Sequence, residues 1–226
     1  MRFLGLMLLG ALGLGGCAKS PVLDANDLPR VASEYVAVFN DLDSWDEGRV
    51  AELFARPSKA KAHRDHLTWL HAQVGDCGEM QPVWQDGTRR ARFAFACERG
   101  GLEVHLRLDR NARIVGVVSG VVGVEPTAPI ASAFDTVLAA MPWREAGAGK
   151  HAWADRLAPL WVRKRGSCEL ERVRMVSEHM GMFDLRCEHG GMYMKVNVKK
   201  DGSLSAVKIW RPEQDEARAF RSKPMG

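Results

Sequence analysis

The sequence predicts an α+β fold made of two tandem domains, each with helices followed by an antiparallel meander of strands. Three observations lead to this prediction. The chain has 226 residues, of which 46% are hydrophobic and 27% are charged, and this composition is typical of a globular protein. A pattern of cysteines and glycines recurs after about 90 residues. In both copies, apolar residues at helical spacing precede runs in which apolar and polar residues alternate.

The first residues of the chain predict export. Met1-Arg2 carries one positive charge, and the apolar run 3–16 is shorter than the about 20 residues that a helix needs to span a bilayer. This order is typical of a secretory signal peptide, which we assign to 1–16. The run ends in Leu14-Gly15-Gly16-Cys17, which resembles the signal of bacterial lipoproteins. The resemblance implies cleavage before Cys17 and attachment of lipid to its thiol and to the new amino terminus.

The residues after Cys17 bear on localisation. The lipoprotein pattern uses Asp at the next position for retention in the inner membrane, and this chain has Ala18, which implies the outer membrane. Residues 17–30 contain two prolines and two aspartates with little apolar periodicity, so we expect a tether between the lipid and the folded part. The alternative is a plain signal peptide that is cleaved elsewhere.

The four remaining cysteines are expected to form two disulfides, because exported proteins fold in an oxidising compartment. The Asp86-Gly87 turn signal centres a hairpin that places Cys77 opposite Cys97, and Cys168 and Cys187 flank two strand-like runs in the same way. We therefore predict the bridges Cys77–Cys97 and Cys168–Cys187 across neighbouring antiparallel strands. A redox or zinc site is the alternative, but the sequence contains no C-x-x-C motif.

The linker Gly-Val-Glu-Pro-Thr-Ala-Pro at 123–129 divides the folded part. We expect the first domain over 31–122, the second over 130–212 and a charged, frayed tail over 213–226. Expected helices cover 31–43, 46–54, 59–74, 130–141 and 152–162, and the clearest strands cover 91–97, 102–108, 114–122, 168–176, 181–187, 192–198 and 204–210.

The order of motifs resembles the small cone-shaped domains of the nuclear-transport-factor-2-like superfamily. The resemblance rests on a helix with Phe39-Asn40-Asp41 or Phe134-Asp135, a tryptophan-containing helix, a Gly-x-Cys motif and a Cys-Glu-x-Gly-Gly motif. The chain is similar, more narrowly, to the version found beside bacterial penicillin-recognising serine hydrolases. The resemblance covers 31–122 well and 130–211 less well. It implies two tandem cone-like domains but no particular activity, because that superfamily includes enzymes, ligand binders and structural modules.

The expected strands offer no catalytic group to the inside of a cone. Catalysis there needs an inward-pointing acid or base with a tuned pKa. Asp41 and Asp135 follow the equivalent Phe39 and Phe134 at different distances, and one residue turns a helical side chain by about 100°, so a shared role is not expected. The apolar strand face consists of Phe93, Phe95, Leu102, Val104, Leu106, Phe183, Leu185, Met192, Met194 and Val196.

The histidines do not predict a metal site. His63 and His66 lie three residues apart on one expected helix, together with His71, and this spacing can bring two metal ligands together. No carboxylate or cysteine joins them convincingly, so we expect neither a metal nor another cofactor. His105 alternates with apolar residues beside Glu103 and is expected on the solvent face of its strand.

Charge and tryptophan content bear on the partner. The formal net charge is only +4 and is spread along the chain, so nucleic acid is not an expected partner. Trp69 and Trp161 recur between the copies and are expected in the core. Some of the other five tryptophans are expected in an exposed apolar patch that marks a partner surface. These are Trp45, Trp84, Trp143, Trp153 and Trp210.

These observations favour a non-catalytic lipoprotein of the bacterial cell envelope that is anchored in the outer membrane and binds a protein or another envelope component. We expect an accessory subunit of a surface, motility or secretion assembly. One alternative is a small-molecule binder or enzyme that uses one cone with Asp41 or Asp135 as base, which a pocket of roughly 300 Å³ with an inward acid would favour. An inhibitor or immunity lipoprotein is the other alternative.

Overall fold

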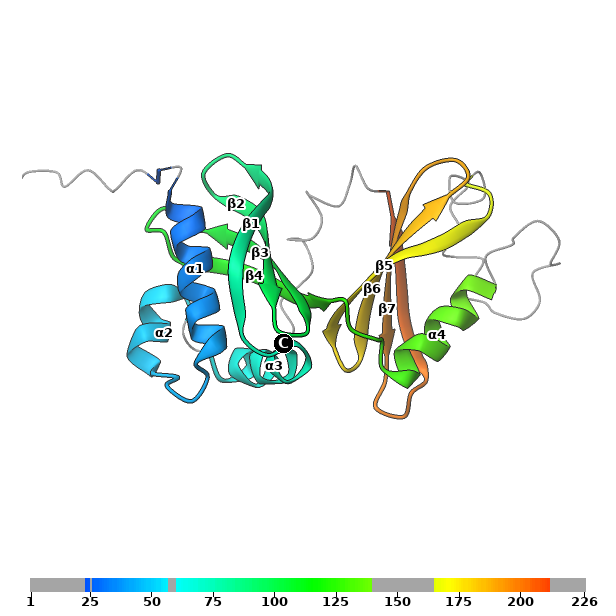
Figure 1. Cartoon of the computed structure of the whole chain (residues 1–226), viewed down its shortest axis with the longest axis horizontal. Helices are drawn as coiled ribbons and strands as arrows, with labels where there is room; N and C mark the ends of the chain where they lie inside the picture. The colour runs from blue at the N-terminus through cyan, green and yellow to red at the C-terminus, as the bar shows by residue number, and fades with distance from the viewer. Residues whose placement is uncertain (1–22, 25, 57–59, 140–164, 212–226) are drawn as a thin grey trace, which may run out of the picture.

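The computed structural model of the protein describes residues 23–24, 26–56, 60–139 and 165–211. The predicted signal peptide, Cys17, the expected helix over 152–162 and the tail over 213–226 lie outside the described residues. Among the described residues, three helices precede four strands, and a further helix precedes four more strands (Figure 1). The helices are α1 (Asp27–Asn40), α2 (Glu47–Leu53), α3 (Ala60–Val74) and α4 (Ala128–Ala139).

The eight strands form one antiparallel sheet in sequence order, from β1 to β8. Each strand pairs with the strand that follows it in the sequence, so the sheet is a single meander. The strands are β1 (Cys77–Asp86), β2 (Arg90–Cys97), β3 (Gly100–Leu108), β4 (Ile114–Val122), β5 (Cys168–Ser177), β6 (Met180–Cys187), β7 (Met192–Val198) and β8 (Leu204–Trp210).

The single sheet contradicts the prediction of two tandem cone-like domains. The last strand of the first copy pairs with the first strand of the second copy, because Val121 lies opposite Met175 and Val122 lies opposite Arg174. The pairing joins β4 and β5 only near the end of β4, as the narrow connection between the two halves shows in Figure 1. The copies are therefore two halves of one sheet rather than separate helix-plus-sheet units.

The core lies between the helices and one face of this sheet. On that face, Leu102 pairs with Val121, Val121 pairs with Met175, and all three side chains are buried. Helix α1 buries Tyr35 and other apolar side chains against the first half. In the second half, Phe134 of α4 stacks on Phe183 of β6 with ring centroids 4.0 Å apart. We call this the helix face, and the opposite side of the sheet the second face.

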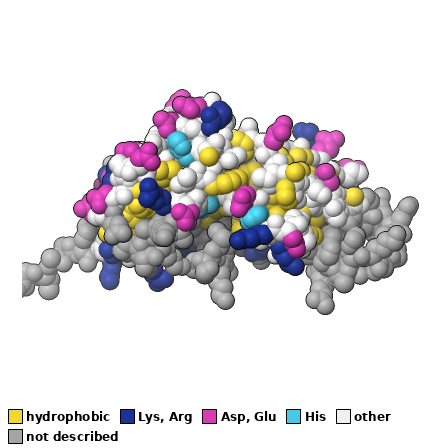
Figure 2. Space-filling view, turned by 90° about the horizontal axis from the view of Figure 1, so that it is seen from below, with side chains coloured by type: hydrophobic (Ala, Val, Ile, Leu, Met, Phe, Trp, Pro, Cys, Tyr) yellow, Lys and Arg dark blue, Asp and Glu magenta, His cyan; other side chains and the backbone are white. Residues whose placement is uncertain are grey.

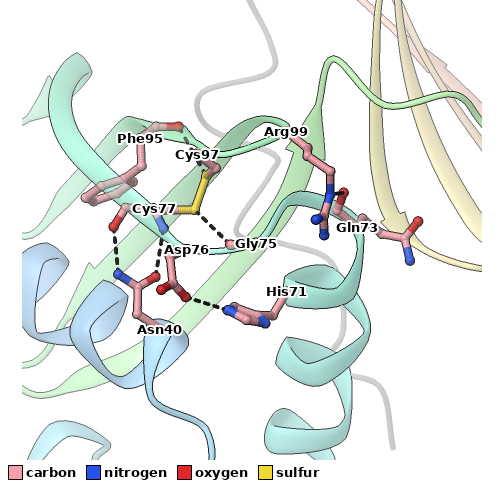
Figure 3. Close-up of a disulfide and its surroundings, with 9 residues drawn as sticks. All are labelled: Asn40, His71, Gln73, Gly75, Asp76, Cys77, Phe95, Cys97 and Arg99. Carbon is pink, nitrogen blue, oxygen red and sulfur yellow. Dashed lines mark hydrogen bonds and ion pairs between the residues drawn. A yellow bond between two sulfur atoms is a disulfide. The ribbon is translucent and has the colours of Figure 1, made fainter.

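Both predicted disulfides are present, Cys77–Cys97 and Cys168–Cys187. In each pair the two cysteines are register partners on neighbouring antiparallel strands. Figure 3 shows how α1 holds the first bridge: the Asn40 side chain donates to the Cys77 carbonyl at 2.7 Å and accepts from the Cys77 amide at 2.9 Å. The Asn40 side chain thus forms the hydrogen bonds with the first residue of β1 that a neighbouring backbone would otherwise form.

The repeated glycines of the cysteine motifs have a backbone role. Gly75 and Gly166 both have positive φ, of 72° and 75°, and a β carbon at either position would collide with the glutamate that follows the second cysteine. The amide of Glu98 donates to the Asp76 carbonyl at 3.0 Å, and the amide of Glu188 donates to the Ser167 carbonyl at 3.1 Å. The recurring motif is therefore the same strand-end turn in both halves.

Candidate functional site

A buried network of four charged side chains lies on the second face at the junction of the two halves. Arg174 donates to Asp184 at 2.9 Å and to Glu103 at 3.2 Å. Arg172 donates through Nε to Asp184 at 2.8 Å and also contacts Glu103. The side chains of Glu103 and Arg174 are each 4% exposed, that of Asp184 9% and that of Arg172 39%. The two positive charges of the arginines match the two negative charges of the carboxylates, so attraction within the network offsets the cost of taking these charges out of water.

A glycine makes this network possible. Glu103 of β3 has to reach over β4 to meet the arginines of β5, and its register partner on β4 is Gly120. A β carbon at Gly120 would lie 3.3 Å from the carbonyl oxygen of Met175 and 3.5 Å from a methyl group of Val176. The absence of a side chain at this position lets β4 and β5 approach and leaves Glu103 a path to Arg174.

The burial of this face overturns one expectation. The alternation in β3 predicts His105 and Glu103 on a solvent face, but both residues are buried in the structure. Burial lowers the pKa of His105 to about 3, and the positive charges of Arg174, Arg92 and Arg172 lower it as well. The ring of His105 is therefore neutral near pH 7. Alternating apolar and polar residues show that a strand has two different faces. They do not show that the polar face is exposed to solvent.

A hollow of about 80 Å³ opens beside the ion network on the second face. Its lining comes from β3 to β8, so the sheet curves strongly enough to bring side chains of β3 and β4 around the same space as those of β7 and β8. Gly120 of β4 lines it, and so do Glu103 and His105 of β3. The apolar wall is formed by Val118, Val176, Met180, Met182 and Trp210.

The hollow is positively charged. Arg174, Lys195 and Lys208 line it together with a single acid, Glu103, which leaves an excess of two positive charges. Burial and the neighbouring Lys208 lower the pKa of Lys195. The Arg174 guanidinium also lies 6.0 Å from the centroid of the Tyr193 ring, within the range of a cation–π contact. The site therefore combines fixed cations with an apolar wall.

A second polar cluster lies inside the helix face of the first half. The Tyr35 hydroxyl is 3.0 Å from His63 Nε2 and 3.0 Å from the Ser119 hydroxyl, which is 3.4 Å from His66 Nε2. Burial raises the pKa of Tyr35 and lowers the pKa of His63 to about 3, with His66 lowering the latter further. Burial also lowers the pKa of His66. The cluster is thus a neutral hydrogen-bonded chain at pH 7.

This inner cluster was missed because its parts come from different elements. None of the strand residues that we predicted for the helix face is ionisable. The side chains of the cluster instead come from three elements: Tyr35 from α1, the two histidines from α3 and Ser119 from β4. The structure does bring His63 and His66 together, with ring centroids 6.0 Å apart. Within the described ranges, no group of three or more histidine, cysteine or carboxylate side chains is arranged to hold a metal.

The two predicted candidate bases lie away from any interior. Asp41 follows the end of α1, is exposed and accepts from the Ser44 amide at 3.3 Å. Asp135 is exposed on α4. His71 pairs with Asp76 at 2.8 Å near the first disulfide, as Figure 3 shows. Asp41 and Asp135 are therefore surface positions, whereas His71 is half-buried, with its ring centroid 5.3 Å from that of Phe39.

A larger hollow of about 310 Å³ lies between α1, α2 and the turn that joins β3 to β4. Its charged side chains include Arg30 and Glu34, which pair at 2.7 Å and are about half exposed. Glu52 of α2 also lines it. Arg113, which also lines it, pairs with Asp109 at 3.3 Å, and neither Asp41 nor Asp135 lines this hollow.

The expected exposed tryptophan patch does not appear in the described residues. Trp45, Trp69 and Trp84 are half-buried, and Trp210 is buried in the wall of the junction hollow. Trp143, Trp153 and Trp161 lie outside the described residues. Figure 2 shows hydrophobic side chains in the middle of one face with acidic and basic side chains interspersed around them.

Comparison with protein-family models and with curated proteins finds no match for this chain. Among the helices of the described ranges, none has both the length and the apolar content that crossing a membrane requires. Function has to be inferred from the chain's own residues.

Proposed function

We propose that the protein is a non-catalytic lipoprotein of the bacterial cell envelope that is anchored to the outer membrane through Cys17 and binds a protein partner through the second face of its sheet. The hollow at the junction of the two halves carries this proposal. It is concave, has an apolar wall that includes Trp210, and carries more positive than negative charge. At about 80 Å³ the hollow is much smaller than the roughly 300 Å³ or more of a small-molecule pocket, which favours a protein surface over a small ligand.

The sequence and the cysteines support the envelope location. Leu14-Gly15-Gly16-Cys17 fits the signal for lipid attachment, and acyl chains anchor a protein without a spanning helix. The disulfides Cys77–Cys97 and Cys168–Cys187 are of the kind that forms and persists in oxidising compartments such as the bacterial periplasm. Both features agree with a protein that is exported and then held at a membrane.

The inner cluster favours a second candidate, an enzyme that uses the first half. The Tyr35 hydroxyl lies 3.0 Å from His63 Nε2, and a phenol beside a neutral imidazole can exchange a proton with a substrate. Neither of the two hollows described above is lined by these side chains. The binding proposal is preferred because its residues surround a space that a ligand can enter.

Membrane fractionation tests the anchor. A Cys17→Ser variant cannot accept the thiol-linked lipid, so it should move from the membrane fraction to the soluble fraction and out of the detergent phase. Persistence of the variant in the detergent phase would contradict lipidation at this residue.

Site-specific photo-crosslinking in intact cells tests the binding surface. A photoreactive amino acid at Val118, in the wall of the hollow, should capture an envelope protein. The same amino acid at Thr136, which is exposed on α4, serves as the matched control. Capture at both positions with the same products, or at neither, would contradict binding through the second face.

A further inference from the structure

We infer that the partner presents an acidic segment to the hollow, with a carboxylate between Lys195 and Lys208 and apolar side chains against Met180 and Met182. This inference rests on the proposed function and names the chemistry of the partner. Four observations on the described residues support it: the register of the two lysines, the lack of an internal acid for them, the apolar wall, and the fixed ion network at its edge.

The two lysines face each other directly. Lys195 on β7 and Lys208 on β8 are register partners in an antiparallel pair. Like charges in directly opposite positions on neighbouring strands destabilise a sheet. Lys195 is only partly exposed, which makes the repulsion less screened than between two fully solvated side chains. An anion that binds between the two ammonium groups would turn this repulsion into two attractions.

The described part of the chain provides no acid for this position. Glu103 is the single acid in the lining of the hollow, and both its carboxylate oxygens already contact Arg172 and Arg174. Within the described ranges, neither Lys195 nor Lys208 forms an ion pair. The excess positive charge is therefore available to a ligand from outside.

The apolar wall selects a peptide over a small inorganic anion. Met180 and Met182 are half-buried and line the same hollow as the lysines, and a bare ion would leave their exposed surfaces in water. Unbranched Met180 and Met182 can adapt to different apolar side chains. An acidic residue flanked by apolar ones satisfies both parts of the site.

The ion network gives the site a rigid edge. Arg174 is held by two carboxylates, and Tyr193 lies both under its guanidinium and opposite Trp210 in the register. The rings of Tyr193 and Trp210 have centroids 6.1 Å apart. Because these side chains are fixed before binding, little conformational entropy is lost when a partner segment docks beside them.

Zero-length carbodiimide crosslinking in intact cells tests the chemistry. The reagent activates a carboxylate, and a lysine amine in contact with it displaces the activating group to form an amide. Mass spectrometry of the full-length protein should show Lys195 or Lys208 joined to an Asp or Glu of another envelope protein. A Lys208→Arg variant keeps the charge but should lose the amide bond at 208, while it retains the bond at 195 where that one forms.

Charge removal provides the quantitative test. A Lys195→Gln/Lys208→Gln variant should reduce photo-capture from position 118 about tenfold, which corresponds to two partly exposed ion pairs. Lys199→Gln/Lys200→Gln is the matched control, because both lysines are exposed in the turn between β7 and β8. The control should leave capture unchanged.

The outcomes separate this inference from the proposed function. Capture that survives the Lys195→Gln/Lys208→Gln change, or falls equally in the control, overturns the acidic segment but leaves binding through the second face standing. An amide bond to Glu213, Asp215 or Glu216 of the same chain shows that its own tail fills the site, and a bond to a second copy shows self-association. Both of these results overturn the inference. No capture from position 118 overturns the inference and the proposed function together.

Discussion

Glu103 of β3 and Arg174 of β5 form a buried ion pair across an intervening strand, with Arg174 Nη1 3.2 Å from Glu103 Oε2. The pair connects the two halves of the chain, which share only two register pairs between β4 and β5. Gly120 leaves the space through which the two side chains meet. The ion network thus adds side-chain contacts to a junction with little strand pairing, and the hollow lies beside it.

Loss of the Glu103 carboxylate should weaken the whole protein. A Glu103→Gln variant leaves Arg172 and Arg174 with one acid between them, and removing one partner from a buried ion pair costs about 3 kcal/mol or more in unfolding free energy. Urea unfolding followed by circular dichroism measures this loss. Glu169→Gln removes an exposed pair with Arg186 and should cost less than about 1 kcal/mol. Similar losses in the two variants would contradict a structural role for the network.

Substitution of Gly100, a glycine of the repeated cysteine motif, should destabilise the protein. Gly100 has a φ of 101°, and a β carbon there would collide with the carbonyl oxygen of Val122. Gly100→Ala therefore combines backbone strain with a steric clash and should lower the unfolding free energy by about 2 kcal/mol or more. Gly87 also has positive φ, of 59°, but open space around it, so Gly87→Ala should cost only about 1 kcal/mol. Thermal unfolding distinguishes the two, and equal losses would contradict the clash.

Removing one disulfide should destabilise both halves together. Cys77 and Cys97 close a loop with a sequence separation of 20, and in the chain-entropy model such a bridge contributes about 3 kcal/mol. A Cys77→Ser/Cys97→Ser variant should lose about this much and still unfold in one step, because β4 continues the sheet into β5. Limited proteolysis that digests the first half while the second stays intact would show that the halves are independent.

Acidification should destabilise the protein through buried histidines. Burial lowers the pKa values of His63 and His105 to about 3 in the folded protein, whereas both groups titrate near 6.5 when unfolded. The unfolded chain therefore binds more protons below pH 6.5, and stability falls as the pH drops from about 6.5 toward 3. At pH 5 the loss is about 2 kcal/mol for each histidine.

Urea unfolding at pH 7 and pH 5 measures this dependence. A His63→Gln/His105→Gln variant has no imidazole to protonate at either position, so the difference between its stabilities at the two pH values should be smaller than in the unaltered protein. The same difference in both proteins would show that other groups cause the pH dependence.

Local patterns in the sequence predicted the local parts of the fold. The cysteine spacing around Asp86-Gly87 gave the first disulfide and its hairpin, and the Cys168–Cys187 bridge followed from the repeat. The apolar patterns indicated seven of the eight strands that the structure describes, because burial on the helix face requires alternation. They gave no range for β1, which is exposed along most of its length. The helix near 46–54 begins at Asp46, whose side chain accepts from the Gly48 amide.

The junction and its site depended on contacts that no local pattern carries. Arg172 and Arg174 lie 69 and 71 residues from Glu103 in sequence, and the alternating charges of each strand look the same whether they face water or each other. The pairing of β4 with β5 includes only two register pairs, and neither contains a motif. The inner cluster also joins Tyr35 to Ser119 over 84 residues.

Hydrogen exchange during urea unfolding tests most directly whether the two halves form one continuous sheet. Peptides from β2 and β3 report on the first half, and peptides from β6 and β7 report on the second. One sheet joined through β4, β5 and the Glu103–Arg174 pair predicts that both sets lose protection at the same urea concentration, and that both midpoints shift together in Glu103→Gln. Separate midpoints, with only the first set shifted by that substitution, would contradict the joined sheet and the binding surface built on it.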